Sequence, residues 1–278
     1  MHLKFTLKNN GFELIKNSKN QSFKNLCKKA YNSHKLFPQK KLKKKWSSLD
    51  GTRKLVQNPH KKIAEFKKIL KSKFVKKILN DYFGNVPLAI NHSKISFKHH
   101  NSDQRWFPHQ DIVYFKDKSQ KGLTLCIYLE DNLKDNGNII CYKNSHKSIK
   151  KHKIVFLKNE KEPQIKCNTN GFKSIFIQAK IGDILCINTK TIHSSGNNHL
   201  QKSTRPIFIF SVVQISKEKI ELDDDGEECF VYNGYRYPRN IIFHKFFYKL
   251  NLVKINFIKK ILYILYKINF FKNREIII

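Results

Sequence analysis

The chain has 278 residues, of which 40% are hydrophobic and 13% aromatic, and its 49 lysines, six arginines and 21 acidic residues give a formal charge of +34. A chain of this length buries about three quarters of its unfolded surface on folding, and the apolar content excludes a disordered polycation. We therefore expect a folded body with a basic surface, which would attract phosphates, anionic lipids and polyanionic substrates. Codon bias is an equal explanation of the charge, because arginine, which reads phosphate geometry best, is scarce.

The cysteines predict a reducing compartment. None of the six has a CxxC neighbour, and Cys126 and Cys186 lie within apolar runs, as buried free thiols do. Lys4 and Lys8 interrupt the stretch where a signal peptide would be apolar, and no run of 18 apolar residues occurs. We expect a cytoplasmic protein that is neither secreted nor membrane-spanning.

Residues 1–90 are predicted to be mostly helical, after a short extended opening around 9–11. The clearest helix covers 60–83 and ends at Gly84, because apolar side chains recur at steps of three and four. These side chains are Ile63, Phe66, Leu70, Phe74, Ile78 and Tyr82. The lysines of this helix fall on its other faces, where a solvated surface is favoured over a nucleic-acid or lipid footprint.

From about 88 to 215 the pattern changes to short runs of β-branched and aromatic residues such as DIVYF, LTLCIYL, DILCIN and PIFIFSVVQ. Turn residues separate these runs, and no helical pattern lies between them. Many short strands at this spacing predict a sandwich or barrel rather than a parallel α/β sheet.

A third segment, 248–272, shows apolar residues at helical spacing with lysines beside them. The favoured interpretation is a helix docked on the protein's own body. Insertion of the same apolar face among anionic headgroups is the alternative, so peripheral membrane contact through 248–272 stays open.

The sharpest local motif is WFPHQD at 106–111. On an extended segment His109 and Asp111 point to the same side, and an imidazole with a carboxylate is two thirds of the facial triad that binds non-haem Fe(II). Alone the motif is weak, because about one such pair is expected by chance in this composition.

A second cluster some eighty residues later strengthens the metal interpretation. A strand that follows Gly182-Asp183 leads to His193, and Arg205 opens the next apolar strand. In an antiparallel barrel such residues can face the same cavity, so His193 could be the third ligand. A guanidinium inside the barrel is tolerable only when it is paired, and a carboxylate is its matching bidentate partner.

Across roughly 90–215 the chain resembles the phytanoyl-CoA dioxygenase family of Fe(II)- and 2-oxoglutarate-dependent oxygenases. The family's HxD pattern matches 109–111, its middle stretch matches LCIYLEDNLKDNGNIICYKNSHK at 125–147, and its GD, distal histidine and arginine match Gly182-Asp183, His193 and Arg205. One departure is Lys143-Asn144, where members often carry Pro-Gly before Ser-His.

The resemblance implies a double-stranded β-helix in which His109, Asp111 and His193 bind Fe(II) and Arg205 holds the distal carboxylate of 2-oxoglutarate. Ser195 matches a position whose hydroxyl can help hold this cosubstrate. Ser96 and Lys98, on the strand before the HxD motif, are weaker candidates for the same task.

The fold prediction is therefore an α+β protein with a jelly-roll (cupin-like) barrel core, N-terminal helices and a basic helical C-terminal extension. A single oxygenase domain is expected over 1–215, with 1–90 as helical support and 91–215 as the jelly-roll core, followed by an extension of docked helices over 216–278.

The predicted activity is hydroxylation of a small or conjugated acidic organic substrate by dioxygen, with release of succinate and carbon dioxide and with ascorbate as a stimulant. Halide-transferring relatives lack the carboxylate ligand, so the presence of Asp111 favours hydroxylation over halogenation. The alternative function is a basic jelly-roll protein that binds anionic membrane or nucleic acid, its iron site unused, although nucleic acid is not the expected partner. Substrate identity and oligomeric state are not predicted.

Overall fold

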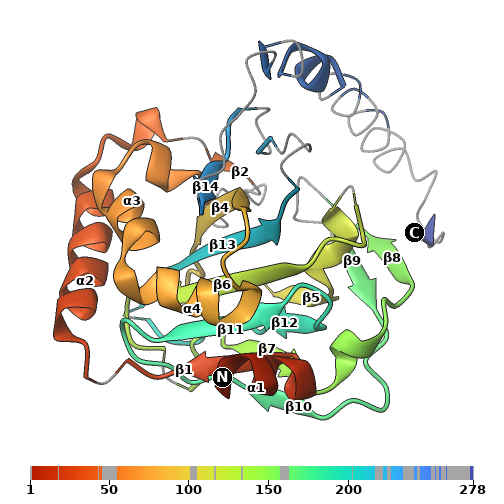
Figure 1. Ribbon diagram of the computed structural model, residues 1–278. Coiled ribbons are helices and arrows are strands. Elements are labelled where there is room, and N and C mark those ends of the chain that lie inside the picture. The colour runs from red at the N-terminus through yellow and green to blue at the C-terminus, as the bar shows by residue number, and fades with distance from the viewer. Residues whose placement is uncertain are drawn as a thin grey trace.

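Two antiparallel β-sheets face each other in the computed structural model of the protein, and helices cover the outer face of the larger one (Figure 1). The structure describes residues 2–277 except for 18, 43, 46–54, 101–104, 116, 133, 157–162, 202, 217–221, 224–226, 234–240, 243–244, 252–253, 255–256, 258–260 and 262–275. The two layers confirm the predicted jelly-roll core.

The larger sheet consists, in the described part of the chain, of eight strands in the order β1-β11-β6-β13-β4-β3-β2, with β14 paired to β4. In chain order these strands are β1 (Phe12–Ile15), β2 (Lys44–Lys45), β3 (Leu55–Gln57), β4 (Leu88–Ser96), β6 (Gly122–Tyr128), β11 (Ile184–Asn188), β13 (Ile207–Gln214) and β14 (Phe230–Tyr232).

The smaller sheet has the strand order β10-β7-β12-β5, and a separate hairpin of β8 and β9 carries β15 at its edge. These strands are β5 (Trp106–His109), β7 (Ile139–Tyr142), β8 (His152–Val155), β9 (Gln164–Cys167), β10 (Ser174–Phe176), β12 (His193–Ser195) and β15 (Ile276–Ile277). Every pairing is antiparallel, as in a jelly roll.

The helices are α1 (His2–Asn10), α2 (Gln21–Leu36), α3 (Ala64–Lys71) and α4 (Lys73–Phe83). The prediction of one helix over 60–83 is wrong in one respect, because the chain breaks into α3 and α4 at Ser72. The backbone of Ser72 is extended (φ −61°, ψ 145°), and its Oγ accepts a hydrogen bond from Val75 N at 3.3 Å, so it caps α4. Gly84, with φ of 82°, ends α4 as predicted.

The chain opening differs from the prediction. Residues around 9–11 are not extended, since α1 continues to Asn10 and stops at Gly11, which has a φ of 88°. The extended segment is β1 instead, and it pairs with β11 at the edge of the larger sheet. An edge strand of four residues is held by this pairing and not by its own weak apolar pattern, which explains why the sequence did not reveal it.

Strand alternation separates two layers of core. On β6 the side chains of Leu123, Leu125 and Ile127 pack against the helices. Cys126 and Tyr128 point the other way, into the space between the sheets. Because both faces of this sheet are covered, its central strands β6 and β13 are apolar at most positions on both faces. A polar side chain on their inner face is therefore informative, and it is there that the candidate site lies.

The described part of residues 216–278 includes β14 on the larger sheet and helical residues at 241–242 and 245–251. The described residues contain no helix with the length and apolarity that a bilayer crossing needs. The division into a domain of 1–215 and an extension of 216–278 stays a prediction.

Candidate functional site

His109 and Asp111 stand at the end of β5. The strand stops at His109, and Asp111 opens a 3₁₀ turn, η3 (Asp111–Tyr114), so the two residues do not share one strand as the sequence analysis assumed. The residue between them, Gln110, keeps an extended backbone (φ −115°, ψ 129°). Side chains two positions apart still point to the same side across such a residue, so the HxD pair converges.

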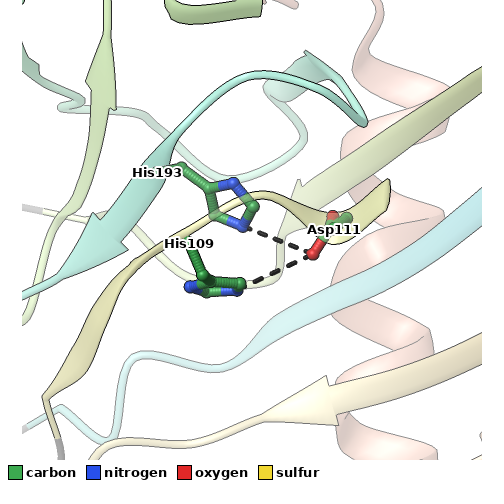
Figure 2. Close-up of side chains that lie close together, drawn as sticks. All are labelled: His109, Asp111 and His193. Atoms are coloured by element: carbon green, nitrogen blue, oxygen red, sulfur yellow. Dashed lines mark ion pairs between the residues drawn. The ribbon is translucent and has the colours of Figure 1, made fainter. Parts of the chain in front are cut away.

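His193 joins this pair from β12, where it lies directly opposite His109 in the antiparallel register. The Nε2 atoms of His109 and His193 are 3.7 and 3.6 Å from Asp111 Oδ1 (Figure 2). The centroids of the two imidazole rings are 4.5 Å apart. One potential ligand atom from each of the three residues lies within 4.8 Å of the others. The structure therefore brings together the three side chains predicted as metal ligands.

Backbone carbonyl groups fix the tautomer of both imidazoles. His109 Nδ1 is 2.7 Å from the carbonyl oxygen of Phe107, and His193 Nδ1 is 3.1 Å from that of Thr191. A carbonyl oxygen only accepts, so each Nδ1 carries a hydrogen and each Nε2 is the nitrogen that faces Asp111. Metal-binding histidines are oriented in this way.

A chain of hydroxyl groups holds the other oxygen of Asp111. Thr124 Oγ1 donates to Asp111 Oδ2 at 2.6 Å and lies 2.9 Å from Ser211 Oγ, which is 3.4 Å from His92 Nε2. Oδ2 is occupied in this way, while Oδ1 faces the two imidazoles. The carboxylate thus presents one oxygen as a ligand.

The protonation states also suit metal binding. Burial, followed by the charge of His193, lowers the pKa of His109 to about 3, so this imidazole is neutral at neutral pH. Burial raises the pKa of Asp111, but His193, His109, Lys94 and the Thr124 hydrogen bond lower it more, and the net pKa is well below the usual value. A neutral imidazole beside an ionised carboxylate is the state in which both coordinate a cation.

Arg205 lies in the same interior and is 3% exposed. Its Nη1 donates to the carbonyl oxygen of Gly137 at 2.9 Å and its Nη2 to Ser96 Oγ at 3.2 Å, whereas Nε has no hydrogen-bond partner among the described residues. Burial lowers its pKa to about 10, which leaves the guanidinium charged at neutral pH. A buried cation with only neutral partners fits a carboxylate ligand.

Local backbone geometry positions this guanidinium. Arg205 has a φ of 44°, a left-handed conformation that non-glycine residues adopt only at a cost. Gly137, whose carbonyl receives the guanidinium, has a φ of 66°, and a Cβ atom there would lie 2.5 Å from Lys98 Cδ. Only glycine fits this position, so the Asn-Gly turn of the sequence supports the arginine.

Tyr128 completes this end of the site. Ile207 of β13 pairs with Ser96 on one side and with Tyr128 on the other, so the two polar side chains flank the same inner position. The Tyr128 hydroxyl is buried and has no partner among the described residues. Like Arg205 Nε, it is a buried polar group that a ligand would satisfy.

Of the other predicted cosubstrate residues, Ser96 accepts a hydrogen bond from Arg205, and the contacts of Ser195 and Lys98 are with other groups. Ser195 is 7% exposed and follows His193 on β12 by two residues, on the same side of the strand. Lys98 is fully buried, and its ammonium group donates to the carbonyl oxygen of Gly196. The roles of Ser195, Ser96 and Lys98 toward a cosubstrate stay predictions.

Sequence reasoning missed Thr124, Tyr128 and Lys94. The usable signal was alternation: Thr124 and Tyr128 occupy even positions in the run LTLCIY, and Lys94 lies two residues before Ser96. Alternation shows that such polar side chains share one face of a strand. It does not show whether that face points toward the site or toward the helices.

Comparison with known proteins agrees with this geometry. The sequence pattern of the family "Phytanoyl-CoA dioxygenase (PhyH)" matches residues 7–206. A probable alpha-ketoglutarate-dependent hypophosphite dioxygenase of Stutzerimonas stutzeri is 24% identical over 155 residues, which cover 52% of this chain and 51% of that protein. The match thus spans about half the length of this relative.

Solved structures share the fold at low sequence identity. The epimerase SnoN in complex with Fe3+, alpha ketoglutarate and nogalamycin RO superposes with a TM-score of 0.57 at 15% identity, over 87% of this chain and 88% of SnoN. The carbocyclase SnoK gives 0.61 at 14% identity, over 77% and 83%. EctD from S. alaskensis with 2-oxoglutarate and 5-hydroxyectoine gives 0.60 at 10% identity, over 77% and 76%.

The jelly-roll fold, the family match and the His-Asp-His cluster define the class as the non-haem iron, 2-oxoglutarate-dependent oxygenases. Within this class the chain belongs to the phytanoyl-CoA dioxygenase family.

Proposed function

We propose that the protein is an Fe(II)- and 2-oxoglutarate-dependent dioxygenase that hydroxylates a small or conjugated acidic substrate and releases succinate and carbon dioxide. The observation that carries this proposal is the convergence of His109 Nε2 and His193 Nε2 on Asp111 Oδ1, at 3.7 and 3.6 Å. Two imidazoles and one carboxylate on one side of a metal leave open positions, which is the ligand set of non-haem Fe(II) oxygenases.

Each group of the site has a role in this reaction. His109, Asp111 and His193 would hold the metal, and the carbonyl groups of Phe107 and Thr191 orient the imidazoles. The iron supplies the oxidising chemistry, together with 2-oxoglutarate and dioxygen. Asp111, fixed by Thr124, keeps the ligand set anionic and fills the position that a halide would need.

Arg205 would bind the distal carboxylate of 2-oxoglutarate through a charge-assisted hydrogen bond, with Tyr128 as a second donor. Both carry buried polar atoms without partners in the described chain. A bound carboxylate would satisfy both groups and neutralise the guanidinium, so the cosubstrate lowers the cost of burying this charge. This pairing also sets the orientation of the cosubstrate relative to the metal ligands.

The acidic nature of the substrate has two supports. The curated relative is named for hypophosphite, a small anion, and the formal charge of +34 favours the approach of anions. Neither support distinguishes a free acid from an acyl conjugate.

The test is turnover of 2-oxoglutarate without the true substrate. Purified protein with Fe(II), 2-oxoglutarate and ascorbate should form succinate slowly. The variant His109→Ala should abolish this reaction, whereas His199→Ala, which removes an exposed histidine, should not. Equal succinate formation by wild type and His109→Ala would contradict the proposal.

Peripheral contact with anionic membrane is a second proposed property, in a protein whose six free, buried cysteines suit the cytoplasm. Lys245 and Lys249 pair with Glu228 and Glu227 at 3.0 and 2.6 Å. Large apolar side chains of the same helical segment are 41–72% exposed, namely Ile242, Phe246, Phe247, Leu250, Phe257 and Ile261. Most of 248–272 lies outside the described residues.

Exposed apolar groups among lysines suit insertion between anionic headgroups. Phe246→Ser/Phe247→Ser protein should no longer co-sediment with vesicles of anionic phospholipid that bind the wild type. The membrane proposal would be contradicted if the wild-type protein did not co-sediment with these vesicles, or if it bound nucleic acid and not the vesicles.

A further inference from the structure

The inner face of the larger sheet is organised in three rows of side chains. The registers of β4, β13 and β6 place Ser96, Ile207 and Tyr128 in one row, Lys94, Ile209 and Cys126 in the next, and His92, Ser211 and Thr124 in the third. The first row contacts Arg205 and the third contacts Asp111. The middle row therefore lies between the cosubstrate end and the metal end of the site.

Lys94 is the charged member of the middle row. It is half-buried, and it shares its face of β4 with Ser96 and His92, because residues two apart in a strand point the same way. In the described part of the chain the ammonium group of Lys94 makes no hydrogen bond and no ion pair. Its neighbours Lys98 and Arg205, by contrast, bind the carbonyl groups of Gly196 and Gly137.

The field of Lys94 reaches the metal ligands. Besides burial and the charge of His193, Lys94 contributes to the lowered pKa of His109. It also helps to depress the pKa of Asp111, after His193 and His109 and against the effect of burial. These effects agree with the inward direction that the register with Ile209 gives Lys94.

With Fe(II) and 2-oxoglutarate bound, the site would contain no counter-charge for Lys94. Fe(II) carries two positive charges and 2-oxoglutarate two negative ones, while Asp111 and Arg205 contribute one of each sign, so these four groups cancel. Lys94 and the buried Lys98 add positive charges that none of these groups balances, and only the ammonium group of Lys98 is hydrogen-bonded, to the carbonyl oxygen of Gly196. A half-buried cation without a counter-charge loses part of its hydration, and an anion next to Lys94 would offset this cost.

We propose that the ammonium group of Lys94 binds an anionic oxygen of the substrate, a carboxylate or a phosphorus oxyanion, and so selects anionic substrates for oxidation next to the metal. This inference rests on the proposed function and identifies Lys94 as the residue that recognises the anionic group of the substrate. It differs from a role in cosubstrate binding, which the proposed function gives to Arg205.

Binding to the loaded protein tests this proposal without turnover. Wild type, Lys94→Met, Lys94→Arg and the exposed control Lys68→Met are loaded with Fe(II) and 2-oxoglutarate in the absence of dioxygen. Calorimetry then measures the affinity of each protein for butyrate, its neutral analogue butyramide, and hypophosphite. The affinity for 2-oxoglutarate itself is measured in the same series.

Lys94→Met is expected to lose about tenfold or more in affinity for an anion that the wild type binds, because an ion pair with a charge-assisted hydrogen bond is removed. Butyramide should bind both proteins equally, Lys94→Arg should retain most of the affinity, and Lys68→Met should behave as wild type. The affinity for 2-oxoglutarate should fall much less in Lys94→Met than in Arg205→Met, since Arg205 and the metal balance its two carboxylates.

Three results would overturn the proposal. They are anions and butyramide binding the wild type equally, Lys94→Met retaining the preference for anions, and Lys94→Met losing 2-oxoglutarate as severely as Arg205→Met. In each case the wild-type protein would still bind Fe(II) and 2-oxoglutarate, so the result would contradict the role of Lys94 and leave the proposed function intact. Wild-type protein that bound no 2-oxoglutarate would overturn the proposed function and this inference together.

Discussion

Thr124 Oγ1 lies 2.6 Å from Asp111 Oδ2, on the side of the carboxylate away from His109 and His193. This hydrogen bond leaves Oδ1 as the oxygen that faces the imidazoles. The hydroxyl belongs to β6, which is buried along its whole length between β11 and β13, so a central strand of the sheet orients the carboxylate.

Replacement of Thr124 by valine should weaken the affinity for Fe(II) about 10- to 100-fold, because the outer partner of a metal ligand is removed while the shape is kept. Thr124→Ser keeps the hydroxyl and should restore most of the affinity. Metal titration of the purified variants measures both effects. Identical affinities for the valine and wild-type proteins would show that Thr124 does not position Asp111.

Arg205→Met should weaken the binding of 2-oxoglutarate by roughly two orders of magnitude, since a buried, charge-assisted contact is lost. Arg205→Lys keeps the charge without the planar fork, so its affinity should be intermediate. Calorimetric titration of the Fe(II)-loaded protein without dioxygen gives the values, with Arg105→Met as the exposed control. A methionine variant that bound the cosubstrate normally would exclude Arg205 from its site.

Tyr128→Phe separates stability from cosubstrate binding. The hydroxyl that it removes has no partner among the described residues, so without 2-oxoglutarate the free energy of unfolding should change by less than about 1 kcal/mol. The increase in melting temperature that 2-oxoglutarate gives the Fe(II)-loaded protein should be smaller in the variant than in the wild type. A large loss of stability in the absence of 2-oxoglutarate would instead indicate a structural role for the hydroxyl.

His60 predicts a pH dependence of stability outside the metal site. It lies in the 3₁₀ turn η2 (Pro59–Lys61), is 7% exposed, and its Nδ1 is 2.7 Å from Ser93 Oγ. Burial, then the charges of Lys61 and Lys67, lowers its pKa to about 4. In the unfolded chain the His60 imidazole is thus protonated below about pH 6.5, whereas in the folded chain it is protonated only below about pH 4.

The contribution of His60 to stability is therefore complete above about pH 6.5 and falls as the pH decreases toward 4, by about 1.4 kcal/mol per pH unit. Between pH 7 and 5 the wild type should lose about 2 kcal/mol more than His60→Gln, which does not titrate. Urea unfolding at both pH values measures the difference. Parallel losses in the two proteins would show that the histidine is protonated in the folded state.

The sequence predicted the jelly roll and the convergence of His109, Asp111 and His193 because a few local patterns indicate them. Two local motifs can be recognised without knowing which strands are neighbours. One is a histidine and an acid two residues apart, and the other is a GD turn followed by a strand, a histidine and an arginine. The extended backbone of Gln110 preserved the pairing of His109 with Asp111 even though β5 ends between them.

The other side chains of the site depend on registers that a single sequence does not contain. Lys94 and Thr124 face the site only because β13 pairs with β4 on one side and with β6 on the other. In strands buried on both faces, apolar residues fill both sides, so alternation no longer indicates which side is inner. The break at Ser72 was missed for a related reason, since the apolar period continues through both helices while one serine changes the chain direction.

A crystal structure of the protein grown without dioxygen in the presence of Fe(II) and 2-oxoglutarate, with the iron located by its anomalous scattering, tests the proposed site most directly. We expect one iron bound by His109, Asp111 and His193, with the distal carboxylate of 2-oxoglutarate on Arg205. Iron bound elsewhere, or a cosubstrate that did not reach Arg205, would contradict the proposed function.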